Sequence, residues 1–133
     1  MITRAVTLVE NHAIESALRT VSIEKQGLAA LEAALAGPLG DSFCKAIDAV
    51  GSSGGRLIIT GVGKSGHIGA KLAATFASTG TPAFFVHAAE ANHGDLGMIS
   101  GNDVVLAISK GGESVELRSI INYTRRFSIP LIA

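Results

Sequence analysis

The fold of this chain is constrained most by a glycine-rich segment at residues 61–69, which reads GVGKSGHIG. It follows a short apolar run at 57–59 and precedes an alanine-rich helical pattern. Glycines at a strand-to-helix turn let the backbone approach a ligand closely. The N-terminus of the following helix then offers free N–H groups and the positive end of the helix dipole. The segment is therefore typical of an α/β fold with a site for an anion, most often a phosphate.

Apolar strand patterns and helical patterns alternate from residue 56 onward. They predict strands at 57–60, 83–87, 104–109 and 129–133, and helices at 65–79 and 115–127. This order indicates a parallel sheet with helices on both faces, a three-layer α/β sandwich of the flavodoxin or Rossmann type. Ligands bind such sheets beyond the carboxyl ends of the strands.

The first 55 residues are predicted to be helical and to pack on the domain formed by residues 56–133. Apolar residues at spacings of three, four and seven indicate a helix over about 7–36, and a second helix is expected to begin near Asp41 or Ser42. The sequence stops within an apolar, strand-like segment, and we interpret it as a fragment of a longer protein.

Composition excludes several functions. Eleven basic and 11 acidic residues give a net charge of zero, so we expect neither a nucleic-acid partner nor a membrane partner. No apolar run has the ~18 residues of a membrane span, and no signal peptide is seen, which favours a cytoplasmic protein. Cys44 is the only cysteine, and we expect it to be buried as a small apolar residue.

Three interpretations of the first glycine-rich loop compete. A Walker A motif is excluded because Ile58 stands where a glycine is required. A dinucleotide fingerprint matches at Gly61, Gly63 and Gly66, with Glu90 as the acid that would hold the ribose. A tight turn without a ligand is the third interpretation.

A second loop, SKGGES at residues 109–114, also joins a predicted strand to a predicted helix. Its hydroxyls and glycine amides suit a phosphate monoester. Two such loops fit a sugar phosphate better than a dinucleotide. The alternative is an ordinary helix cap, in which the Ser114 side chain caps the helix.

The segment EANHGDLGM at residues 90–98 lies between the two loops. His93 and Asp95 are candidates for moving or orienting a proton, because histidine titrates near neutral pH. The alternatives are a structural loop, in which Asp95 binds nearby amides, and a metal site that includes His87 and Glu90. The spacing matches no standard zinc pattern, so we predict no metal and no cofactor.

The sequence resembles the D-arabinose-5-phosphate isomerase family, whose members carry a sugar isomerase (SIS) domain. The segments that carry the resemblance are 61–69, AATFASTGTP at 73–82, FFVH at 84–87 and HGDLGM at 93–98. The resemblance implies a five-stranded parallel sheet flanked by helices. It also implies an intramolecular oxidoreductase that interconverts ribulose 5-phosphate and arabinose 5-phosphate through an enediolate. That reaction leads to the eight-carbon acid sugar of lipopolysaccharide.

The resemblance also implies roles for particular residues. Lys64 matches the lysine of the catalytic loop, Glu116 the carboxylate that moves the substrate proton, and His93 the histidine of the His-Gly-Asp motif. The positions that match the phosphate site are Gly63, Ser65, Ser109, Gly112 and Ser114. SIS-domain sites are commonly completed across subunits, so the resemblance implies a homo-oligomer, a tetramer or dimer, that binds a small sugar phosphate.

The sequence departs from the family in the second loop, where Lys110 and Gly111 replace the usual asparagine and serine. This leaves a different sugar phosphate, or a non-catalytic sensor, as alternatives, and a Rossmann oxidoreductase as a more distant one. The family's other acid and its catalytic histidine lie beyond residue 133, as do its CBS domains. We therefore expect this polypeptide by itself to be inactive.

Overall fold

The computed structural model describes residues 2–133, with side chains from residue 11 onward. The chain forms two compact units, residues 1–44 and 45–133. The helices are α1 (Ile2–Leu35), α2 (Gly40–Gly51), α3 (Gly63–Ser78), α4 (Ala88–Ala91) and α5 (Arg118–Arg126), with the 3-10 turns η1 (Asp95–Met98) and η2 (Val115–Leu117). The strands are β1 (Leu57–Gly61), β2 (Ala83–His87), β3 (Val104–Ile108) and β4 (Leu131–Ile132).

Two helices form the N-terminal part, as the sequence predicts. α1 carries a row of apolar side chains that are largely exposed, between 59% and 68% for Ile14, Leu18, Val21 and Leu28. α2 begins at Gly40, so Asp41 lies in its first turn and favours the helix dipole. The expectation that Cys44 is buried is wrong, because α2 has no buried residue and leaves this thiol exposed.

The four strands form one parallel sheet in the order β2-β1-β3-β4. All five residues of the central strand β1 are buried, which explains why it begins with the continuous apolar run Leu57–Ile59 rather than with an alternating pattern. The strand β2 lies at one edge and the two-residue strand β4 at the other. The predicted parallel sheet is confirmed.

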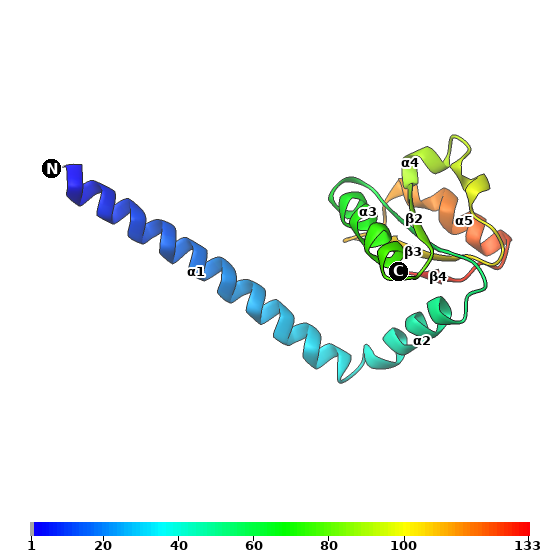
Figure 1. Ribbon diagram of the computed structural model, residues 1–133, viewed down its shortest axis with the longest axis horizontal. Helices are drawn as coiled ribbons and strands as arrows, with labels where there is room; N and C mark the ends of the chain where they lie inside the picture. The colour runs from blue at the N-terminus through cyan, green and yellow to red at the C-terminus, as the bar shows by residue number, and fades with distance from the viewer. Residues whose placement is uncertain (1) are drawn as a thin grey trace. The chain divides into compact units, whose positions relative to one another are not determined.

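Helices cover both faces of the sheet, which confirms the three-layer sandwich. In Figure 1, α3 lies on one side of the strands and α5 on the other. Alternate residues of β1 serve the two cores, because Ile59 packs in a cluster with Ala73 of α3 while Ile58 packs in a cluster with Ile120 of α5.

Two segments differ from the expected secondary structure. The helix predicted at 115–127 is divided into η2 and α5, and the segment expected to be a loop contains α4 and η1. Both segments contribute to the core: Leu117 of η2 and the two alanines Ala88 and Ala91 of α4 are buried in the same cluster as Ile120. Within the residues that the structure describes, no helix combines the length and apolar character needed to cross a membrane.

Candidate functional site

The carboxyl ends of three adjacent strands meet at one edge of the sheet. Gly61 at the end of β1 is in register with His87 at the end of β2 and with Ile108 at the end of β3. The segments that follow these three residues therefore leave the sheet side by side. They contain the residues that the sequence singles out as candidates.

The first loop, residues 61–66, turns directly from β1 into α3. Val62 occupies the N-cap position with extended backbone angles and makes no side-chain capping bond. Gly63 has a φ of 55°, a left-handed conformation that favours glycine. Since no side chain caps the first turn, its N–H groups and the positive end of the 16-residue helix α3 are available to an anion. Lys64 is exposed and Ser65 half-buried in that turn.

The remaining glycines of the segment bring α3 close to the sheet. A Cβ atom on Gly66 would lie 3.1 Å from the carbonyl oxygen of Gly61, and one on Gly69 would lie 3.0 Å from the Phe85 ring. Packing therefore explains Gly66 and Gly69, and the positive φ of the turn explains Gly63. The match to a dinucleotide fingerprint needs no dinucleotide, and the start of α3 stays a candidate anion site.

The second loop, residues 109–114, is held together by its own hydroxyl groups. Ser109 Oγ lies 3.2 Å from Ser114 Oγ and accepts a hydrogen bond of 3.1 Å from the Gly112 amide. Gly112 has a φ of 72°, again in the region that favours glycine. The structure thus brings together three of the predicted phosphate-site residues.

The alternative interpretation of Ser114 as a helix cap is wrong for its side chain. Ser114 stands at the N-cap position of η2 but makes no side-chain capping bond. The amide of Leu117 is instead bound by the backbone carbonyl of Ser114 at 3.1 Å. The Ser114 hydroxyl remains directed toward Ser109.

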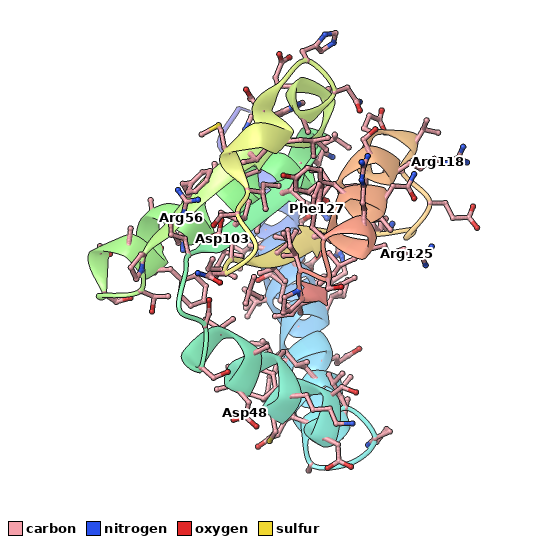
Figure 2. All side chains as sticks on the ribbon, turned by 90° about the vertical axis from the view of Figure 1, so that its right-hand side faces the viewer. Asp48, Arg56, Asp103, Arg118, Arg125 and Phe127 are labelled. Carbon is pink, nitrogen blue, oxygen red and sulfur yellow. The ribbon has the colours of Figure 1, made fainter. Side chains whose placement is uncertain are left out.

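The second loop opens onto a groove that also involves α5. Gly112, Glu113, Ser114, Arg118 and Ile121 line a volume of about 340 Å³. Arg118 is exposed, and Figure 2 shows it on α5. This cation was not predicted from the sequence; an arginine four residues after the serine that ends a glycine-rich loop is the signal that points to it. Glu116, in η2, is exposed as well.

The segment between the two loops is ordered by a local cap. His87 Nδ1 accepts a hydrogen bond of 3.3 Å from the Ala89 amide and so caps α4. His93 follows α4 and is exposed, and Asp95 begins η1 and is half-buried. Among the residues whose side chains are described, no three His, Cys, Asp or Glu side chains lie close enough to hold a metal ion.

Before the first residues of β1 and β3, at the end of the sheet opposite the loops, lies an ion pair with a buried carboxylate that was not predicted from the sequence. Asp103, whose side chain is fully buried, accepts hydrogen bonds of 2.8–3.1 Å from the Arg56 backbone amide, from the Arg56 guanidinium and from the Ser100 amide. Figure 2 shows the two side chains beside each other. Burial raises the pKa of Asp103, but the bonds from Arg56 and Ser100 outweigh it and lower the pKa to about 2. Arg56 also stacks 4.8 Å from the centre of the Phe84 ring.

Comparison with known proteins agrees with this geometry. The family model described as SIS domain matches residues 52–133. Arabinose 5-phosphate isomerase KdsD of Pseudomonas aeruginosa is 48% identical over 120 residues, which cover 90% of this chain and 36% of that protein. The protein of the same name from Francisella tularensis is 63% identical over 78 residues, 59% of this chain and 24% of that protein.

A solved structure also matches. The structure described as E. coli CFT073 c3406 in complex with A5P superposes with a TM-score of 0.69 at 47% identity, covering 78% of this chain and 55% of that one. The chain spans about a third of the length of the curated relatives that it matches. With its parallel sheet, its two loops and a family model that covers most of the chain, this protein belongs to the SIS-domain family.

Proposed function

We propose that the protein containing this chain is a sugar-phosphate aldose–ketose isomerase that interconverts arabinose 5-phosphate and ribulose 5-phosphate. The observation that supports this most is the pair of loops at one edge of the sheet, with an uncapped helix start in one and two paired serine hydroxyls in the other. The choice of substrate rests on the relatives that are named arabinose 5-phosphate isomerase.

The two loops would hold the phosphate group. The amides of the first turn of α3, from Gly63 and its neighbours, donate to phosphate oxygens, and the Ser65 hydroxyl adds a further donor. The Ser109, Gly112 and Ser114 cluster faces the same edge from β3. Binding energy from the phosphate is remote from the reacting carbons and serves to position them.

Three side chains would carry the chemistry on the sugar. The Glu116 carboxylate takes the proton from the carbon next to the carbonyl and returns it to the neighbouring carbon, with an enediolate between the two steps. Lys64 stabilises the negative oxygen of that intermediate, for which one well-placed donor is worth about 3–4 kcal/mol. His93 moves protons between the sugar oxygens. All three are exposed on the segments that leave this edge of the sheet.

The test uses the full-length natural protein that contains this segment. It is incubated with ribulose 5-phosphate and assayed for arabinose 5-phosphate, beside Glu116→Gln and the matched variant Glu113→Gln of the neighbouring exposed carboxylate. Removal of a general base typically costs about 10²–10⁴-fold in kcat. We expect that loss in Glu116→Gln and a much smaller change in Glu113→Gln.

The same assay separates this function from its alternatives. A full-length protein that binds the sugar phosphate with no turnover would be a sensor. Turnover of another sugar phosphate in preference would assign a different substrate, which Gly111 favours because it removes a hydroxyl from the second loop. Equal losses in both glutamine variants would exclude Glu116 as the base.

A further inference from the structure

Thr60 stands out among the buried residues of the sheet. Its side chain is fully buried in β1, and Thr60 Oγ1 is the one buried side-chain polar atom without a hydrogen-bond partner in the part of the chain that the structure describes. The residues before it, Leu57 to Ile59, are aliphatic, and valine would fill the same volume without a buried hydroxyl. A hydroxyl at this position therefore calls for a partner.

The register of the sheet places Thr60 beneath the second loop. Thr60 pairs with Ala107 of β3, and side chains two residues apart on a strand share a face, so Ser109 follows Ala107 on the face that carries Thr60. This is the face on which Ile58 and Ala107 pack in one cluster. Thr60 thus lies on β1, and Ser109 directly follows the adjacent strand β3, two residues beyond the partner of Thr60.

The hydrogen bonds of Ser109 leave one position open. A serine oxygen has one proton to donate and two lone pairs. At Ser109 the Gly112 amide uses one lone pair, and the contact with Ser114 Oγ uses either the other lone pair or the proton. One donor or acceptor position of Ser109 therefore remains for a third partner.

The dianion of a bound phosphate monoester would fix the direction of this chain of hydroxyls, because its terminal oxygens carry no proton and only accept. Ser114 must then donate to the phosphate and accept from Ser109, so the open position of Ser109 becomes its second lone pair. A water molecule can donate to that lone pair while accepting from the Thr60 hydroxyl. Such a water has polar partners on both sides, as buried waters require.

We infer that Thr60 is a positioning residue of the phosphate site, which acts through one ordered water on Ser109 and so orients the Ser114 hydroxyl toward the phosphate. The inference rests on the proposed function only in taking the second loop as the phosphate site. A residue of β1 thus orients hydroxyl groups of the second loop, which follows β3. It also accounts for a hydroxyl that would otherwise be buried without a partner.

The experiment measures binding of arabinose 5-phosphate and of inorganic phosphate to the full-length protein by calorimetry. Three proteins are compared: the unaltered one, Thr60→Val, which keeps the volume, and Thr60→Ser, which keeps the hydroxyl. We expect Thr60→Val to weaken both ligands about 5–10-fold, as for the loss of one water-mediated hydrogen bond, and Thr60→Ser to stay within about 2-fold. The melting temperature of Thr60→Val should not fall, since no bond visible in this structure is removed.

A double-mutant cycle with Ser109→Ala distinguishes positioning from packing. Thr60→Val should have no further effect on phosphate binding once Ser109 has lost its hydroxyl. Additive effects, equal losses in Thr60→Ser and Thr60→Val, or unchanged binding in Thr60→Val would each overturn the inference, as would a protein that binds neither ligand. Phosphate binding that depends on Thr60 in a protein without isomerase turnover would uphold the inference while rejecting the proposed function.

Discussion

At the scale of single residues, Asp103 shows how a charge is kept inside this fold. Its carboxylate is fully buried and receives hydrogen bonds from two backbone amides as well as from the Arg56 side chain, which is itself 42% exposed. We expect Asp103→Ala to lower the free energy of unfolding by about 2–4 kcal/mol, because the amides of Arg56 and Ser100 and the Arg56 guanidinium lose their acceptor. Urea unfolding measures this. Asp48→Ala, at an exposed carboxylate of α2, is the control and should change it by less than about 0.5 kcal/mol.

The same carboxylate predicts a dependence of stability on pH. The pKa of Asp103 in the folded protein is about 2, below the ordinary value of 3.8. The charged form therefore stabilises the fold above about pH 4, and this contribution disappears as the pH falls through about 2. The unfolding free energy of the unaltered protein should fall between these pH values more steeply than that of Asp103→Asn. Parallel curves for the two proteins would contradict the assignment.

Two adjacent glycines of the second loop provide a matched comparison. Both have open space around the position of a Cβ atom, but only Gly112 has a positive φ, of 72°. We expect Gly112→Ala to cost about 1–2 kcal/mol of strain or to move the loop, and so to weaken phosphate binding. Gly111→Ala should leave binding near the unaltered value. Calorimetry with arabinose 5-phosphate checks both, and equal effects would mean that the φ of Gly112 is not what the loop requires.

The residues of the site were predictable from sequence to different degrees. Ser109, Gly112 and Ser114 lie within six positions of one another, so their meeting follows from a local pattern. Arg56 and Asp103 are 47 positions apart, and only the register of β1 and β3 brings them together. The roles of Lys64, His93 and Glu116 stay predictions, because they depend on a substrate.

At the scale of elements, the contact between α3 and the sheet depends on glycine. A Cβ atom on Gly69 would lie 3.0 Å from the Phe85 ring and 3.2 Å from Ile59. Gly69→Ala should therefore destabilise the fold by about 1–3 kcal/mol through overpacking. Gly27 lies within α1 with nothing near its Cβ position, so Gly27→Ala should stabilise that helix by up to about 1 kcal/mol. Thermal unfolding of the two variants should thus shift in opposite directions, and a stabilising Gly69→Ala would contradict this packing.

Elements were predicted best where their sequence pattern and their burial agree. The strand β1 is buried throughout and begins with three aliphatic residues, and the prediction matches it to within one residue. The helix predicted at 115–127 was wrong in its first turn, where the chain tightens into η2 and buries Leu117. Periodicity alone does not distinguish the two kinds of turn, because both place residues three apart on one side.

At the scale of the whole molecule, the apolar row on α1 is exposed in this structure and could be covered by a partner. Leu18 and Leu28 are 64% and 68% exposed, more than a stable surface helix usually leaves uncovered. We expect the protein to be a homo-oligomer in which this row is covered. The double variant Leu18→Glu and Leu28→Glu should lower its mass in light scattering, and Gln26→Glu, on another side of α1, should not. A monomeric unaltered protein would contradict the expectation.

The two ends of the strand pair β1 and β3 have separate roles. Arg56 precedes β1 and Asp103 precedes β3, whereas the first and second loops lie at the other ends of these strands. The strand pair β1 and β3 thus has the Arg56–Asp103 ion pair at one end and the two candidate ligand-binding loops at the other. Substitutions in the loops should therefore be able to change the ligand while the ion pair holds the register of β1 and β3. A transfer of the two loops onto another parallel sheet should therefore include the Arg56–Asp103 ion pair.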